Sequence, residues 1–282
     1  MRRPITCWGI YRELAHSPGR ETDDAEILRA TAADLERLGF TVALKSPDEL
    51  PDADDFDAVP PHLFVMCERV PVVDKLAAWE ARGARVVNRP SGIRNTDRER
   101  TLALFQAKRV PYPRTVLVET SARAAFDGPA WVKRGDVHAT EAGDVVHCAD
   151  DGALRRNLAR LSERGIRRAI VQDHVAGDLV KFYGVAGLEE DGRPSWFQWF
   201  YHREQKLSNH PFDPEALSAT TARAAAALGL EVYGGDAIVS EGGTLTVIDL
   251  NAWPSFALFR PVAAARIAAL LAARFSSTEV IR

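Results

Sequence analysis

The stretch at residues 235–251 constrains the fold most, because two apolar, β-branched runs flank the pair Gly242-Gly243. A glycine pair readily takes the positive φ angles of a two-residue hairpin turn, so this stretch is predicted to be a β-hairpin. Counting outward from that turn sets Asp236 opposite Asp249. Side chains alternate between the two faces of a strand, so Asn251 is expected to point the same way as Asp249.

Three oxygen-bearing side chains would then converge on one face of the hairpin. Two carboxylates packed together repel each other unless a cation lies between them. Mg²⁺ is the expected ion, because it takes hard oxygen ligands and keeps positions open for substrate phosphates. The alternative is the solvated face of an ordinary hairpin. It is less favoured, because no opposite charge interrupts the polar face and the runs are otherwise too apolar for an exposed edge.

The composition is that of a soluble globular protein. The 282 residues are 46% hydrophobic and 27% charged, enough for one large domain or two to three smaller ones with a real core. A net charge of -3 gives no basic footprint, so nucleic acid is not an expected partner. The N-terminus lacks the apolar core of a signal peptide, and no apolar stretch reaches membrane-spanning length. The three scattered cysteines argue against a disulfide framework and against a cysteine zinc site. A cytoplasmic protein with no membrane partner is expected.

Short apolar strands and amphipathic helices alternate over the first ninety residues. Strands are expected at 5–10, 40–44, 62–66 and 84–87, and helices at 23–38 and 72–81. This alternation is the signature of a small parallel sheet covered by helices. Ligands of such sheets bind at the carboxyl ends of the strands, which points to the loop at 11–22 and to the region after Cys67. For Arg12 and Arg20 in that loop, plain solvated surface is an equally good reading.

A turn-rich joint at 88–92 marks a domain boundary, and elements of both kinds follow it. Helices are expected at 97–108, 121–126, 151–164, 214–228 and 261–275, and strands at 114–118, 130–133, 144–148, 168–174, 179–186 and 195–201. Aromatic side chains of the strand at 195–201 point to both of its faces, so both faces are expected to be covered. Lys133 ends one strand and precedes a polar loop at 134–143, which contains His138. That loop is a candidate flap over phosphates, although a plain exposed hairpin loop has a similar composition.

Four blocks in register resemble the ATP-grasp superfamily over roughly the last two-thirds of the chain. They are Asp97-Arg98 with Val110-Pro111-Tyr112-Pro113, then Trp131-Val132-Lys133, then residues 171–177, and finally Gly235-Asp236 with Ile248-Asp249-Leu250-Asn251. The resemblance implies a mixed α/β and α+β architecture, the ATP-grasp fold. An N-terminal parallel α/β domain (1–90) would be followed by two α+β subdomains (91–174 and 175–282) that clamp ATP between them.

The same resemblance implies roles for individual residues. The metal ligands would be Asp236, Asp249 and Asn251, with Mg²⁺ or alternatively Mn²⁺ as the ion. Lys133 and Arg98 would contact the phosphates of ATP. Lys181 and His138 complete the catalytic candidates. In a kinase, His138 would act as an acid/base or hold an anionic substrate. The nucleoside would be held at a hinge by Gln172, Asp173, His174, Val175 and Asp178.

Three features depart from the family's usual pattern. Arg98 stands where most amide-forming members have lysine, Asp249 stands where many have glutamate, and the flap lacks a run of glycines. Together with His138, Lys181 and an Asp-x-Asn-x-x-Pro metal strand, Arg98 resembles the inositol-trisphosphate 5/6-kinase branch. The more numerous branch comprises carboxylate–amine ligases similar to D-alanine–D-alanine ligase and glutathione synthetase.

Two reactions on a small-molecule substrate are therefore open. In a ligase, a carboxylate attacks the γ-phosphate of ATP to give an acyl phosphate, which an amine converts to an amide. In a kinase, a hydroxyl attacks and keeps the phosphoryl group. A non-catalytic ATP-binding module is the third reading, but it predicts loss of metal ligands, and all three are present. We favour the ligase because that branch is larger.

The lining of the substrate pocket would separate the two reactions. Several basic residues there, such as Lys181, Arg203, Lys206 and Arg260, would favour a phosphorylated substrate. A neutral pocket with one carboxylate-binding arginine would favour an acid. Many members of the superfamily dimerise, which allows a homodimer, but the sequence identifies neither the substrate nor the oligomeric state.

Overall fold

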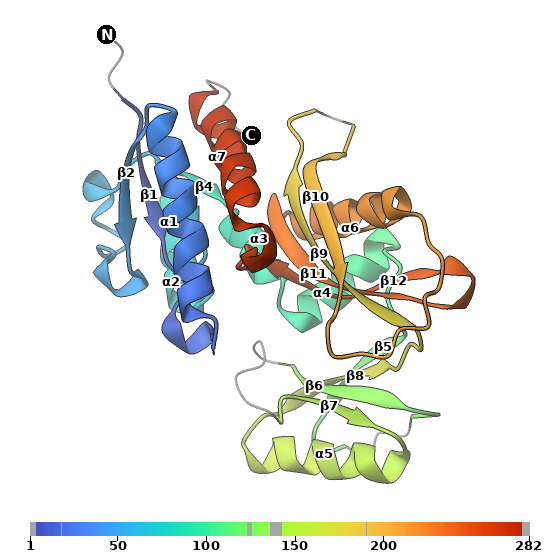
Figure 1. The fold of residues 1–282 in the computed structure, drawn as a ribbon. Coiled ribbons are helices and arrows are strands. Elements are labelled where there is room, and N and C mark those ends of the chain that lie inside the picture. The colour runs from blue at the N-terminus through green and yellow to red at the C-terminus, as the bar shows by residue number, and fades with distance from the viewer. Residues whose placement is uncertain (1–3, 18, 123–125, 136–142, 190, 278–282) are drawn as a thin grey trace.

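The computed structural model of the chain describes residues 4–17, 19–122, 126–135, 143–189 and 191–277. They build three four-stranded sheets with helices packed against them (Figure 1). The fold is therefore the predicted mixture of a parallel α/β part and antiparallel α+β parts. None of the described helices is long and apolar enough to span a membrane.

The N-terminal sheet is parallel and has the strand order β2-β1-β3-β4. Its strands are Thr6–Ile10 (β1), Thr41–Lys45 (β2), His62–Val65 (β3) and Arg85–Val87 (β4). Helix α1 (Glu21–Arg37) packs with Phe64 on one face, and α2 (Val70–Ala81) packs with Leu63 and Val65 on the other. Short 3-10 helices lie in the connections at Leu14–His16 (η1), Pro47–Glu49 (η2) and Phe56–Ala58 (η3).

The last helix of the chain, α7 (Arg260–Ser276), lies beside α1 and shares its core (Figure 1). Arg260 joins the two helices by binding Asp23 (2.6 Å) and Glu26. The amphipathic pattern predicts the helix, but its partner lies more than two hundred residues away and cannot be read from the pattern.

The central sheet is antiparallel with the order β5-β8-β6-β7. Its strands are Thr115–Glu119 (β5), Ala130–Arg134 (β6), Val145–Cys148 (β7) and Arg168–Asp173 (β8). Helix α5 (Asp151–Glu163) begins where the Asp150 carboxylate accepts the N–H of Ala153 (2.8 Å), and it covers Val132 and Val171 on one face. Lys133 and Gln172 alternate with those residues, so they lie on the opposite face.

The C-terminal sheet is antiparallel with the order β10-β9-β11-β12. Its strands are Asp178–Ala186 (β9), Pro194–Tyr201 (β10), Val232–Val239 (β11) and Leu245–Ala252 (β12), and the 3-10 helix Ala257–Phe259 (η5) precedes α7. Helix α6 (Pro214–Leu228) packs on one face, together with α3 (Pro90–Asn95) and α4 (Arg98–Lys108). The expected turn-rich joint at 88–92 in fact runs into α3, because Pro90 fits the first turn of a helix.

The aromatic strand β10 is covered on both faces, as predicted. Phe197, Trp199 and Tyr201 pack against the core beneath α6. On the other face, Trp196 and Phe200 contact Phe259 at centroid distances of 6.2 and 6.0 Å. The second face of this sheet is thus closed near α7 and open farther along, where the polar side chains lie.

Candidate active site

The hairpin of β11 and β12 sets Asp236 opposite Asp249, as predicted, but its turn differs from the expected one. The turn is a 3-10 segment, Glu241–Gly243 (η4), and the N–H of Ser240 donates to the carbonyl of Thr244 (2.9 Å). It is one residue longer than a two-residue turn, and a bulge after Asp236 shifts the register back by one. The two differences cancel, so the prediction of a two-residue turn is wrong while the pairing derived from it is correct.

The three predicted metal ligands lie on one face of the sheet and line the same cavity. Asn251 donates from Nδ2 to Oδ2 of Asp249 (3.2 Å), which leaves the amide oxygen of Asn251 available. Burial raises the pKa of Asp236, the Lys181 ammonium lowers it, and the Asp249 charge raises it again. Asp236 and Asp249 are therefore close enough to repel each other.

A cation faces Asp236 from the neighbouring strand. Lys181 on β9 is the register partner of Asp236 and binds both carboxylate oxygens, at 2.8 and 3.1 Å. The expectation that no opposite charge interrupts the polar face holds within the hairpin but is wrong for the sheet. The sequence could not show this, because it does not reveal which strand pairs with β11.

Two carboxylates and an amide fit Mg²⁺, which is commonly held by one or two carboxylates together with substrate phosphates. Within the described residues, no group of three or more His, Cys, Asp and Glu side chains could hold a metal ion alone. Asp236 and Asp249 with the amide of Asn251 make up the donor set at this site.

Lys133 and Arg98 approach Asp249 from the other parts of the fold. Lys133 reaches from β6 to β12, where Nζ donates to the carbonyl of Ile248 (3.3 Å). Arg98, the first residue of α4, donates from Nη1 to the carbonyl of Arg134 (2.7 Å). Burial lowers the pKa of both cations, and the charge of Asp249 opposes that decrease in both. Three structural elements thus bring two predicted phosphate ligands to one predicted metal ligand.

The predicted hinge begins with Gln172, which is buried on the face of β8 opposite α5. Its Nε2 donates to Oγ1 of Thr115 (3.2 Å), and the Tyr112 hydroxyl is hydrogen-bonded to it. Burial, with the charge of Asp249, raises the pKa of Tyr112 to about 12. The side chain of Gln172 is therefore held by its protein neighbours.

Both carboxylates of the hinge are also bound to protein groups. Asp173 accepts two hydrogen bonds from Arg114, at 3.1 and 3.2 Å. Asp178 is buried and accepts the backbone N–H groups of Ser208 (2.6 Å) and His210 (2.9 Å). Burial alone would raise the pKa of Asp178, but these donors lower it overall.

His174 belongs to a ring cluster at the end of the hinge, and the half-buried Val175 follows it. Nε1 of Trp131 donates to Nδ1 of His174 (3.1 Å), and the ring of His147 lies 5.0 Å from that of His174. Burial, together with the neighbouring His147, lowers the pKa of His174. The remaining catalytic candidate, His138, lies outside the described residues, as do 136–142 of the predicted flap and 123–125 of the helix expected at 121–126.

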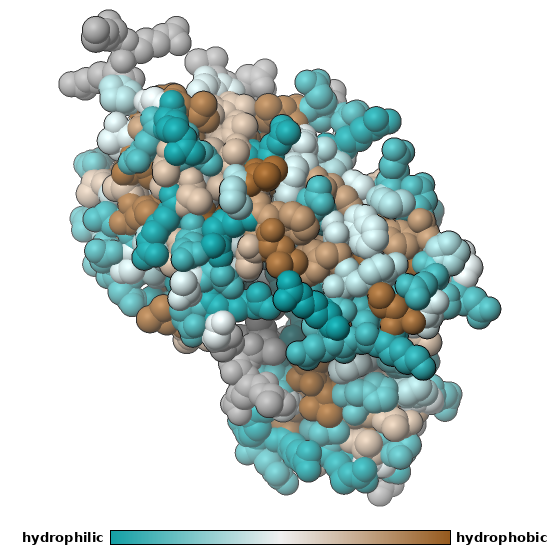
Figure 2. Space-filling view, in the orientation of Figure 1, coloured by the Kyte–Doolittle hydropathy of each residue, from teal (hydrophilic) through white to brown (hydrophobic). Residues whose placement is uncertain are grey.

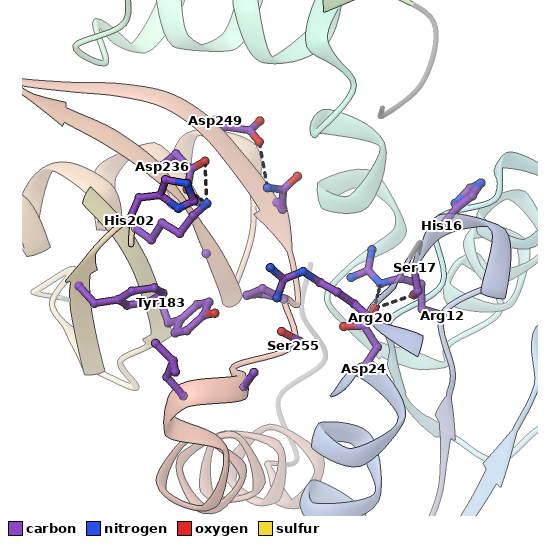
Figure 3. Close-up of a pocket in the computed structure, with 18 of the residues that line it drawn as sticks. Arg12, His16, Ser17, Arg20, Asp24, Tyr183, His202, Asp236, Asp249 and Ser255 are labelled. Atoms are coloured by element: carbon purple, nitrogen blue, oxygen red, sulfur yellow. Dashed lines mark hydrogen bonds and ion pairs between the residues drawn. The ribbon is translucent and has the colours of Figure 1, made fainter. Parts of the chain in front are cut away.

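A cavity of about 750 Å³ lies between the N-terminal part and the C-terminal sheet (Figure 3). It is lined by Asp236, Asp249, Asn251, Arg98, Lys181 and Arg203, and by Arg12, His16, Ser17, Arg20, Asp24, Glu68, Tyr183 and Ser255. Figure 3 shows Asp236, Asp249 and Tyr183 on one side of the cavity and Arg12, His16, Ser17 and Asp24 on the other. In the space-filling view, hydrophilic side chains gather around the hollow between the central sheet and the rest of the molecule (Figure 2). The polar lining agrees with a site for charged ligands.

The sequence could not show whether Arg12 lies on the solvated surface. In the structure its side chain is buried. Its Nη2 donates to the carbonyls of Ala252 (3.1 Å), the last residue of β12, and Trp253 (2.7 Å). It also forms ion pairs with Asp24 (3.2 Å) and Glu68. The surface reading is therefore wrong for Arg12, whereas Arg20 is exposed and lines the cavity.

Tyr183 and Ser255 also line the cavity, and sequence reasoning missed both. Tyr183 lies two residues after Lys181, so the strand period of two could have placed it on the same face. Ser255 has no such signal, because it follows the end of β12.

No protein family matches the sequence, and no curated protein matches it. Three structures with similar folds were compared with the chain. A RimK-domain ATP-grasp protein from Sphaerobacter thermophilus is 20% identical, with a TM-score of 0.66 over 95% of this chain and 99% of that one. D-alanine–D-alanine ligase from Bacillus anthracis, in complex with ATP, is 11% identical, with a TM-score of 0.68 over 98% and 100%.

The ATP-grasp ligase PsnB, in complex with a minimal precursor, Mg and ADP, is 16% identical, with a TM-score of 0.64 over 96% of this chain and 98% of that one. Sequence identities this low support a shared fold but not a shared activity. The agreement extends over nearly the full length of both chains in each comparison. This chain therefore has the ATP-grasp fold.

Proposed function

We propose that this protein is an ATP- and Mg²⁺-dependent carboxylate–amine ligase that activates a small acid as an acyl phosphate. The structures with similar folds include ligases bound to ATP, or to Mg and ADP, which supports both the nucleotide and the metal. The observation that carries the proposal is the cavity lining. The proposed metal ligands line it together with the cations Arg98 and Lys181, and with Arg12, which is paired with Asp24 and Glu68.

Asp236, Asp249 and Asn251 would hold Mg²⁺, which neutralises the charge of the phosphoryl group during its transfer. Lys133 and Arg98 lie beside Asp249, where they would contact the ATP phosphates. Lys181 holds Asp236 in this structure. With Mg²⁺ held by Asp236, the Lys181 ammonium would be available to the γ-phosphate or to the substrate carboxylate.

We place adenine at the hinge of Gln172, His174 and Val175, on the cleft side of the central sheet. Asp173 and Asp178 are assigned a supporting role, because Arg114 and the backbone of 208–210 already occupy their oxygens. That assignment narrows the set of nucleotide contacts expected from the sequence.

Of the four basic residues whose presence would favour a phosphorylated substrate, Lys181 and Arg203 line the cavity, and Lys181 is bound to Asp236. Arg260 is bound to Asp23 and Glu26 between helices, and neither it nor Lys206 is among the residues that line the cavity. Arg12 is neutralised by two carboxylates. We favour an acid because a substrate with several phosphates needs several unpaired cations, whereas Lys181 and Arg12 are already paired with carboxylates.

In the proposed reaction, a carboxylate oxygen of the acid attacks the γ-phosphorus of ATP and ADP leaves. A neutral amine then attacks the acyl carbon, inorganic phosphate leaves, and the amine nitrogen loses one proton. The products are an amide, ADP and phosphate. The protein contributes position and charge, since the chemistry needs no covalent bond to a side chain.

The test is product analysis over a matrix of small acids and amines with Mg²⁺ and ATP. A ligase releases ADP and phosphate in equal amounts, and only when acid and amine are both present. ADP without free phosphate, together with a phosphorylated product, would instead show a kinase. No ADP in any combination, with ATP still bound, would support a non-catalytic module.

A further inference from the structure

Arg20 presents an exposed guanidinium to the cavity from the residue before α1. Figure 3 shows its side chain extended across the cavity toward the C-terminal sheet. Among the residues described, Arg20 makes no hydrogen bond or ion pair through its side chain. The neighbouring cations are engaged, Arg12 with Asp24 and Glu68, and Lys181 with Asp236.

Two hydroxyl groups lie beside this guanidinium. Tyr183 and Ser255 line the same cavity as Arg20, and the charge of Arg20 opposes the increase in the pKa of Tyr183 that burial causes. The ring of Tyr183 is fixed by Phe256 and Phe200, at centroid distances of 4.9 and 5.5 Å. The buried Ser255 lies in a bend at which Phe256 has a φ of +51°. The ring of Tyr183 and the chain at Ser255 are therefore held in place by packing before any ligand binds.

We propose that Arg20, Tyr183 and Ser255 form a subsite for a substrate carboxylate that is not the one phosphorylated. This inference rests on the proposed ligase function and adds a second recognised group to it. A guanidinium donates two parallel hydrogen bonds to a carboxylate, and adjacent hydroxyls can complete its coordination.

The surroundings select a carboxylate over a phosphate. Arg12, Asp24 and Glu68 contribute one positive and two negative charges to the same wall, which leaves one net negative charge close to the subsite. A singly charged carboxylate tolerates that neighbour better than a doubly charged phosphate does.

The position of the subsite excludes the reacting carboxylate. The carboxylate that attacks ATP must lie beside Asp249, Arg98 and Lys133, where the phosphates are expected. Figure 3 shows Asp249 and Ser255 at different ends of the cavity. The bound carboxylate therefore belongs either to the amine reactant, as in an amino acid, or to the far end of a dicarboxylic acid.

The experiment compares pairs of probes that differ only in this group. Amino acids are compared with their own amides, and succinate and glutarate with their monoamides. Binding is measured by calorimetry with Mg²⁺ and a non-hydrolysable ATP analogue, so no turnover is needed. At least one carboxylate is expected to bind about 10- to 100-fold more tightly than its amide, the range for a hydrogen-bonded charge pair.

Arg20→Ala is expected to abolish that preference, and Tyr183→Phe to reduce it about 3- to 10-fold while keeping the ring. Arg37→Ala, at the other end of α1, is the matched control and should keep the preference. A preference among the amino acids would assign the bound carboxylate to the amine reactant. A preference among the dicarboxylic acids would assign it to the far end of the acid.

The proposal is overturned if no probe prefers the carboxylate in the wild-type protein, or if Arg20→Ala keeps the preference. Its failure can be told from failure of the ligase function. Arg20-dependent binding without phosphate release would leave the subsite standing and refute the ligase. If the protein ligates its substrates but binds carboxylate probes and their amides equally tightly, the ligase function stands and the subsite is refuted.

Discussion

Replacing Arg12 by methionine tests how the N-terminal part is joined to the metal strand. The guanidinium is almost fully buried, with its side chain 9% exposed, between Asp24 and Glu68. Its other donors bind the carbonyls of Ala252 and Trp253, directly after Asn251. Methionine keeps much of the volume and removes every one of these interactions. Two carboxylates and two carbonyls then each lose a donor, although Asp24 keeps the hydroxyl of Ser17 (2.6 Å).

Removing one partner of a buried ion pair costs about 3–5 kcal/mol, because the remaining charge is left without compensation. For a chain of this size, 1 kcal/mol shifts Tm by about 2–4 °C. Arg12→Met should therefore lower Tm by about 6–20 °C. Arg260→Met is the matched control, since Arg260 also joins two carboxylates but those are 37% and 44% exposed, and its loss should cost about 0–1 kcal/mol.

The penalty should also depend on pH. Burial raises the pKa of Asp24, and the Arg12 charge is the main opposing effect, so the substitution raises it further. A carboxyl whose folded-state pKa exceeds its unfolded value destabilises the fold increasingly as pH rises through the folded pKa. The difference in unfolding free energy between the wild type and Arg12→Met should thus be larger at pH 8 than at pH 5. Chemical denaturation at both pH values measures it. A penalty no greater than that of Arg260→Met, with no pH dependence, would refute the reasoning.

The remaining predictions concern the metal, the nucleotide and the hinge. Asp249→Asn should lower kcat/KM at least ~100-fold, because it removes a metal ligand, yet leave Tm within a few degrees, since relief of repulsion with Asp236 offsets lost attraction to Arg98 and Lys133. Near-wild-type turnover would contradict the metal assignment. Lys133→Ala should weaken binding of an ATP analogue about 10- to 100-fold in calorimetry, and an unchanged Kd would exclude its phosphate contact. Asp178→Asn should cost about 1–3 kcal/mol of stability with little change in ATP affinity. Unchanged stability in chemical denaturation, together with weaker ATP binding in calorimetry, would mean that Asp178 contacts the ribose.

Elements with a clear local period were predictable from the sequence. The helix at Pro214–Leu228 was predicted to the residue, because Pro214 and Gly229 mark its ends and its apolar positions follow the helical period. The pairing of Asp236 with Asp249 was also predicted, although only because an extra turn residue and a bulge offset each other. Local patterns therefore predicted which side chains share a face, but not the detail of the turn.

Interactions between distant segments were not predictable. The ion pair of Lys181 with Asp236 depends on the pairing of β9 with β11, and the sequence does not state strand order. The contacts of Arg12 with Ala252 and Trp253 span some 240 residues. In the sequence, Arg12 and Arg20 are two similar arginines in one polar loop. Only the tertiary packing shows that Arg12 is buried between two segments, whereas Arg20 is exposed in the cavity.

The central claim is that ATP activates a substrate carboxylate. Once an active acid and amine are found, the acid is prepared with ¹⁸O in its carboxylate and the released phosphate is examined by mass spectrometry. Attack on the γ-phosphorus through a carboxylate oxygen predicts that each phosphate carries one ¹⁸O atom from the acid. Release of unlabelled phosphate alongside amide would contradict the acyl-phosphate route, and a phosphorylated product without free phosphate would contradict the ligase itself.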